Sequence, residues 1–268
     1  MFYKEKFKSI KEFNLTRDFS KHKLNLTNKI AKIREMCIIC ENPKKLSKLT
    51  TINCNGCQEI KEIKGLIELR ELNIDNTNIS SIPILPKLKV LSCNNTKIKK
   101  IKNLSNLKTL NASNSMLKKI KNCNNLRYIS ITNTPIKTIP SIDTLEDLTC
   151  NQSKLESIPL LKNLTHLNIS ECKELKIDFS NLPELVYLNC NNTDSITEIP
   201  HISTLKYLYC NDSFVGYVNS KNINLVTLQC KNSKLKKIKL FSLRDIYCDD
   251  NLIFEDCKKL VFKNGLCI

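Results

Sequence analysis

A leucine recurs along most of the chain at a nearly constant interval, and this periodicity constrains the fold more than any other feature. Six leucines stand at positions 69, 88, 107, 126, 145 and 164, with the same step of 19 each time. Leu49 precedes them by a step of 20, and the series continues at steps of 21, 20, 20 and 18 with Leu185, Leu205, Leu225 and Leu243. A fixed period of this length indicates a solenoid in which short units stack on one another.

Each unit follows the pattern LxxLxCxxTxIxxIPxLxx, with some positions varying. The first six residues alternate as a short strand does, so that Leu88, Leu91 and Cys93 point to one side and the residues between them to the other. The second half often carries Ile-Pro, as at Pro83 and Pro140, and is too short for more than one helical turn. We expect that half to be extended or polyproline-like.

The ninth position of the unit carries a hydroxyl in most copies. A buried hydroxyl can donate and accept, so stacked copies are expected to satisfy backbone groups where each strand turns a corner. The residues are Thr77, Thr96, Ser115, Thr134, Ser153, Thr193, Ser213 and Ser233.

This pattern resembles the leucine-rich-repeat family, in the short-unit class of bacterial effector and giant-virus proteins, over residues 46–260. The usual asparagine of the ninth position appears only at Asn251, and Cys57 and Cys172 also occupy that place. The resemblance implies an α/β-type solenoid, mostly β: a right-handed horseshoe or arc of about eleven units, with a parallel sheet on the concave face. Around it we expect a basic, partly helical N-terminal cap at residues 1–45 and a C-terminal cap or tail at 261–268.

The 14 cysteines allow two interpretations. The pairs Cys37/Cys40 and Cys54/Cys57 have the spacing of a four-thiolate zinc site. Cys54 and Cys57 also fall at the inward sixth and ninth positions, where cysteines of other units stand, and free cysteine packs as a small buried hydrophobe. We therefore predict neither a metal nor a cofactor, and keep the zinc site as the alternative. Because the N-terminus lacks an apolar signal core, reduced thiols in the cytoplasm are expected.

Aromatic residues concentrate at the third and fifth positions, which face outward on the expected sheet. Tyrosine offers stiff contact area with a polar tip, which suits an interface, although it also suits any β surface. The candidate partner-binding residues are Tyr128, His166, Tyr187, Tyr207, Tyr209 and Tyr247.

The net charge of +17 raises the possibility of a nucleic-acid partner. Positions 1–48 hold 13 Lys and Arg against 5 Asp and Glu, so much of the excess precedes the repeats. Lysines of the array, such as Lys97, Lys99, Lys118 and Lys119, fall past the strand on the corner toward the convex side. They form either a solvated basic rim or a phosphate-binding stripe.

The sequence offers no catalytic constellation. Its four glycines do not form a phosphate-binding loop, and His22, His166 and His201 stand apart. No apolar run reaches the length of a membrane span. We therefore expect a monomeric, non-enzymatic module that binds a protein partner on its concave face. One interpretation is that the module is a viral or pathogen protein that acts on host factors. A nucleic-acid-associated protein and a zinc-containing adaptor are the alternatives.

Overall fold

The computed structural model of the chain describes residues 48–240 and 242–255, together with the backbone of 262–263 and 266–267. All described residues belong to one compact unit of the chain. The N-terminal cap predicted at residues 1–45 therefore lies outside the described residues, as does the boundary between array and tail at 260/261.

One sheet runs through the whole array and supplies one strand to each unit. Eleven strands pair in parallel in chain order, and two antiparallel strands close the C-terminal edge. The strands are β1 Thr51–Asn53, β2 Glu71–Asn73, β3 Val90–Ser92, β5 Thr109–Asn111, β7 Tyr128–Ser130, β8 Asp147–Thr149, β9 His166–Asn168, β10 Tyr187–Asn189, β12 Tyr207–Tyr209, β14 Thr227–Gln229, β16 Asp245–Tyr247, β18 Phe262–Lys263 and β19 Leu266–Cys267. The predicted repeat solenoid is confirmed, since each unit contributes one short strand.

The register follows the leucine period. The fourth residue of each unit lies opposite the fourth residue of the next, as in the series Ile129, Leu148 and Leu167. These side chains are at most 2% exposed and form a continuous core with the opening leucines and the sixth-position residues. The apolar spine is therefore shared between neighbouring units.

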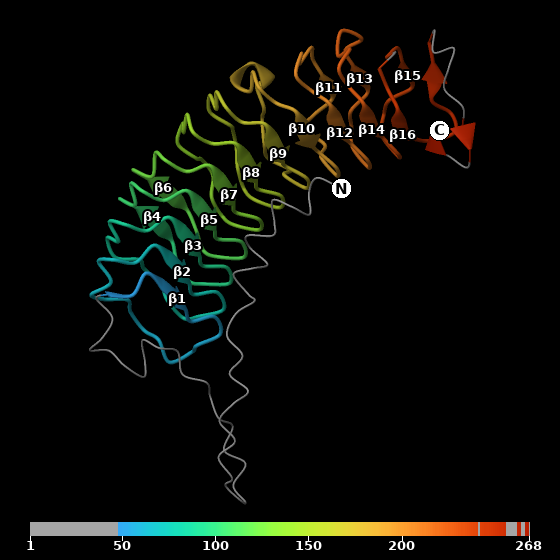
Figure 1. Ribbon diagram of the computed structural model, residues 1–268. Coiled ribbons are helices and arrows are strands. Elements are labelled where there is room, and N and C mark those ends of the chain that lie inside the picture. The colour runs from blue at the N-terminus through green and yellow to red at the C-terminus, as the bar shows by residue number, and fades with distance from the viewer. Residues whose placement is uncertain (1–47, 241, 256–261, 264–265, 268) are drawn as a thin grey trace, which may run out of the picture. The chain divides into compact units, whose positions relative to one another are not determined.

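Short strands also form on the opposite, convex side of the array. They pair in parallel in three separate two-stranded sheets, while the main sheet lines the inner side of the arc (Figure 1). These strands are β4 Lys100–Lys102, β6 Lys119–Lys121, β11 Glu198–Ile199, β13 Tyr217–Val218, β15 Lys237–Ile238 and β17 Ile253–Phe254. A 3-10 helix, η2, spans Phe179–Asn181, and within the described residues no helix is long and apolar enough to cross a membrane.

The corner after each main-sheet strand is built from two side-chain positions. At the ninth position the hydroxyl donates to the carbonyl of the sixth residue of its own unit, as in Thr134 to Ile131 at 2.7 Å. At the eighth position the residue has a positive φ, between 51° and 59° in nine units, a conformation that asparagine tolerates well. Amides at this position also bond between units, as Asn95 Nδ2 donates to Asn76 Oδ1 at 2.9 Å. The eighth position thus joins neighbouring turns.

Candidate functional site

The six predicted binding residues all lie on strands of the main sheet, on its concave side. Four of them occupy one row of the register, in which Tyr128, Asp147, His166, Tyr187 and Tyr207 follow one another across five strands. Tyr209 and Tyr247 lie in the parallel row, separated by Gln229 of β14. The period of two along each strand places both rows on the same face.

Three of these rings contact one another directly. His166 and Tyr187 stack with ring centroids 5.8 Å apart and an interplanar angle of 20°. Tyr187 and Tyr209 are tilted by 39° with centroids 5.2 Å apart, and Tyr207 lies directly opposite Tyr187 with 39% of its surface exposed. We call His166, Tyr187, Tyr207 and Tyr209 the concave aromatic patch. Tyr128 and Tyr247 flank it, each separated from it by one strand that carries another residue at the same level.

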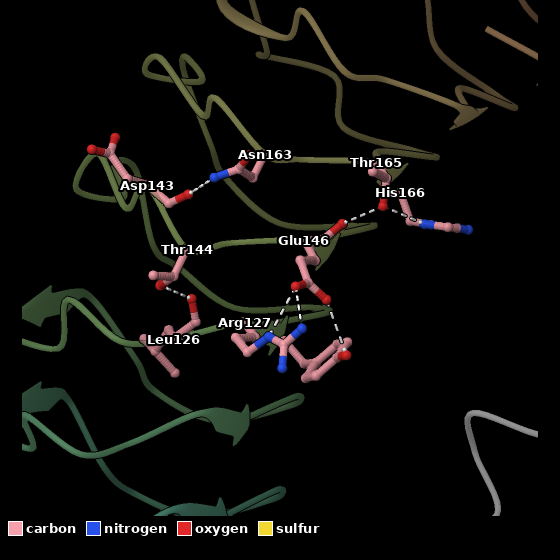
Figure 2. A network of polar contacts seen from close by, with 9 residues as sticks. Leu126, Arg127, Asp143, Thr144, Glu146, Asn163, Thr165 and His166 are labelled. Carbon is pink, nitrogen blue, oxygen red and sulfur yellow. Dashed lines mark hydrogen bonds and ion pairs between the residues drawn. The ribbon is translucent and has the colours of Figure 1, made fainter. Parts of the chain in front are cut away.

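A polar network borders the patch on its N-terminal side. Glu146 accepts hydrogen bonds from the Arg127 guanidinium, with Nε at 2.9 Å from Oε1, and from the Tyr128 hydroxyl at 3.1 Å. Thr165 Oγ1 lies 3.1 Å from the Glu146 carbonyl oxygen and 2.8 Å from Nδ1 of His166, so the network reaches the patch (Figure 2). These bonds fix one end of the aromatic row. The Arg127–Glu146 pair was not predicted, although two opposite charges one period apart were a visible signal.

The environment of two tyrosines raises their pKa values. Burial is the main cause at Tyr128, and the hydrogen bond to the Glu146 carboxylate adds to it. Burial is again the main cause at Tyr209, followed by the nearby Tyr207 and Asp245. Both phenols are therefore neutral at physiological pH and present hydroxyl groups rather than charges.

The cysteines of successive units stack in the core. Cys190, Cys210 and Cys230 are at most 2% exposed and are not joined by disulfides. Burial raises the pKa of Cys190 and that of Cys230 to about 12, and it also raises that of Cys210. These thiols are protonated at neutral pH, as expected of core packing rather than of nucleophiles or metal ligands.

Cys172 differs from these thiols because it occupies the ninth position. Its sulfur lies 3.0 Å from the carbonyl oxygen of Cys150 and 3.7 Å from Oγ of Ser153. A hydrogen bond with the side-chain thiol of Cys150 lowers the pKa of Cys172 to about 7, against the opposing effect of burial, and raises that of Cys150. Among the described thiols whose pKa departs from the ordinary value of cysteine, Cys172 is therefore the most acidic.

Only two of the four cysteines of the alternative zinc site lie within the described residues. Cys54 and Cys57 are 1% and 5% exposed and belong to the core, whereas Cys37 and Cys40 lie outside the described residues. Within residues 48–240 and 242–255, no group of three or more His, Cys, Asp or Glu side chains is placed to hold a metal ion.

We predict that the protein purified under reducing conditions carries no stoichiometric zinc. Replacing Cys37 and Cys40 together by serine should leave the melting temperature little changed, because thiolate ligation would otherwise contribute directly to folding stability. Metal content is measured by mass spectrometry and melting by circular dichroism. One equivalent of zinc that disappears in the double variant would contradict the prediction.

Comparisons with known proteins agree with this architecture. A family model described as "Leucine Rich repeats (2 copies)" matches residues 67–106. No curated protein matches the sequence. Solved structures of several leucine-rich-repeat proteins have a similar fold at low sequence identity.

Three of these structures illustrate the likeness. Toll in the Toll–Spatzle complex of Drosophila has a TM-score of 0.62 at 16% identity, over 78% of this chain and 34% of that one. The GASSHO1/SCHENGEN3 receptor ectodomain of Arabidopsis thaliana has a TM-score of 0.51 at 18% identity, over 78% and 36%. The effector YopM of Yersinia pestis has a TM-score of 0.51 at 18% identity, over 77% and 73%. This chain thus spans about a third of the first two structures and most of the third.

The period, the register of one strand per unit and these matches lead to one conclusion. The chain has the solenoid fold of leucine-rich-repeat proteins, built from short units, and its residues 67–106 match a family model of such repeats.

Proposed function

We propose that this protein is a non-enzymatic interaction module that binds a protein partner on the concave aromatic patch. The observation that carries the proposal is the contiguity of the patch: rings from three successive main-sheet strands touch, and Tyr207 remains 39% exposed. Tyrosine rings give large contact area at low conformational cost, which is why they are enriched at protein interfaces.

The polar surroundings of the patch suit a protein ligand. Asn168 and Asn189 lie on the same strands, two residues after His166 and Tyr187, and each uses Oδ1 to accept a backbone N–H of the corner that follows. This arrangement holds the two amides in place beside the rings. Rigid rings with ordered amides beside them are a common composition of protein-binding surfaces.

The similar structures support the same class of partner. Two of them are complexes, Toll with Spatzle and GASSHO1/SCHENGEN3 with CASPARIAN STRIP INTEGRITY FACTOR 2. For this chain we carry over only the class, a protein ligand of unknown identity. We further propose that the protein works as a monomer in a reducing compartment such as the cytoplasm, or the host cytoplasm if it is a viral or pathogen protein. Cys190, Cys210 and Cys230 are not joined by disulfides, which suits that compartment.

The test replaces Tyr187, Tyr207 and Tyr209 singly by alanine. Each change should weaken binding of the partner at least fivefold wherever the ring is a true hot spot, which corresponds to about 1 kcal/mol. Tyr217→Ala is the matched control, since this tyrosine is 52% exposed but lies on the convex strand β13. The partner is recovered by affinity capture from host lysate with a nuclease-treated arm, and its affinity for each variant is then titrated with purified protein.

Two outcomes would reject the proposal. One is a partner whose affinity is unchanged in all three concave variants. The other is a partner whose binding Tyr217→Ala weakens as strongly as the concave changes do, because loss of any exposed tyrosine would then explain the effect.

A further inference from the structure

The positive charge of the array is concentrated in its first half. Residues 76–142 hold 12 Lys and Arg and no Asp or Glu, so a whole block of consecutive units lacks acidic side chains. The remaining residues after position 48 are close to balanced in charge. A general compositional bias toward lysine would not remove every Asp and Glu from one block of units. The uneven distribution of charge along the array therefore requires a physical explanation.

The densest part of this block is the convex sheet of β4 and β6. Lys100 lies directly opposite Lys119, and Lys102 lies opposite Lys121. Between them Ile101 and Ile120 point into the core at 0% and 6% exposure, so the lysines face outward. Lys99 and Lys118 precede the two strands and are also exposed. We call these six side chains, Lys99, Lys100, Lys102, Lys118, Lys119 and Lys121, the convex lysine patch.

Placing like charges directly opposite on neighbouring strands is unfavourable, because the strands are only about 4.8 Å apart. Within the described part of the chain, none of the six lysines takes part in an ion pair. In the next unit, by contrast, Lys137 pairs with Glu156 at 2.7 Å. Lys137 stands at the same repeat position as Lys99 and Lys118, so the array neutralises this position one unit further on. Within the described residues, the lysines of the convex lysine patch have no acidic partner of this kind.

The surroundings of the patch narrow the choice of anionic partner. No aromatic residue occurs from position 76 to position 127, so exposed bases of a single strand would find nothing to stack on. Met116 is the sole exposed large hydrophobic residue described between positions 85 and 159, so the surface has little to insert into a lipid layer. A rigid two-stranded sheet carrying lysines at regular spacing suits a partner with regularly spaced phosphates on a stiff backbone.

We propose that the convex lysine patch is a second binding surface, which docks the phosphate backbone of duplex nucleic acid without reading its sequence. The contacts are charge-based: each ammonium group that reaches a phosphate releases a condensed counterion, and the repulsion between opposed lysines is relieved on binding. This surface lies on the opposite side of the solenoid from the concave aromatic patch (Figure 1). Both partners can therefore be held at the same time.

The test uses the full chain and a labelled mixed-sequence DNA duplex, titrated at several salt concentrations. The variant replaces Lys100, Lys102, Lys119 and Lys121 together by glutamine. Its affinity should fall at least tenfold at low salt, and its plot of log K against log salt concentration should be shallower by about 2 to 4 units, at about 0.9 per lost phosphate contact. Its melting temperature should be unchanged or higher, because like-charge pairs have been removed.

A matched variant replaces Lys154, Lys173, Lys221 and Lys236 by glutamine and so removes the same charge from exposed sites elsewhere. It should retain most of the duplex affinity and the original salt slope. An equal loss of duplex affinity in this variant would show that net charge alone determines binding, and it would overturn the proposal. Absence of duplex binding by the unaltered protein would overturn it as well, as would patch-dependent binding to phosphatidylserine vesicles in place of the duplex.

Discussion

Leu148→Ala should lower the free energy of unfolding by about 2 to 5 kcal/mol. Leu148 is fully buried on β8 and stands in register between Ile129 and Leu167, so its side chain belongs to the interfaces with both neighbouring units. Truncation leaves a cavity that the stacked turns cannot close without moving their strands out of register. Urea denaturation followed by circular dichroism measures the loss, and Leu110→Ala on β5 should behave in the same way.

Lys119→Ala and Lys99→Ala are the controls for this prediction, because both side chains are exposed on the convex side. Each should change stability by no more than about 0.5 kcal/mol. Since each unit of a solenoid contacts only its neighbours, the leucine variants should also unfold with a broader transition as the two halves of the array uncouple. Equal losses at leucine and lysine sites would mean that the inward and outward positions have been wrongly assigned.

The fold was predictable because one short pattern repeats many times. The regular spacing of the leucines determines which residues lie side by side, and the alternation within the strand determines which of them face the core. Tyr187 and Tyr207 could therefore be placed on neighbouring strands from the sequence alone, and the structure confirms their register. Whether they bind a partner remains a prediction, since placement on a face does not identify what that face contacts.

Other features depend on geometry that the pattern does not contain. The ninth-position hydroxyls satisfy backbone groups at the corner, as the pattern predicted, and Thr134 does so within its own unit by donating to the Ile131 carbonyl oxygen. The donor and the acceptor are only three residues apart, so the turn at the corner brings the sixth-position oxygen within reach of the hydroxyl. The eighth position forms side-chain bonds between units that the pattern did not predict, because asparagine there combines a positive φ with an amide that reaches the next turn.

The ring contacts of the candidate site also could not be predicted from the sequence. Tyr187 contacts Tyr209 diagonally across the sheet, and the rotamers of both rings decide that contact. The sequence does indicate that lysines of neighbouring units lie close together, because Lys100 and Lys119 are one period apart. It does not show that they pair directly, because the pattern does not predict that the convex segment forms strands in this part of the array.

Asn222→Leu should destabilise the array by about 2 to 4 kcal/mol, although leucine is a common residue at this place in the other units. The residue three positions before each opening leucine is apolar elsewhere, as at Leu182, Ile202 and Leu240, and Asn222 alone is polar in the described part of this column. Its side chain is fully buried. Nδ2 donates to the Pro200 carbonyl oxygen at 2.9 Å, and Oδ1 accepts the Ile202 N–H at 2.7 Å.

Leucine fills a similar volume but offers neither a donor nor an acceptor, so two backbone groups of the preceding unit would lose their partner inside the protein. Each such loss costs about 1 to 3 kcal/mol, more than the added apolar contact returns. Asn224→Leu is the matched control, because the Asn224 amide donates to the Ser203 carbonyl at 2.7 Å on the exposed surface, where water replaces it. Its cost should stay below about 1 kcal/mol, measured by urea denaturation as before. An Asn222→Leu protein as stable as the original would show that the column prefers an apolar residue and that the two backbone groups find other partners.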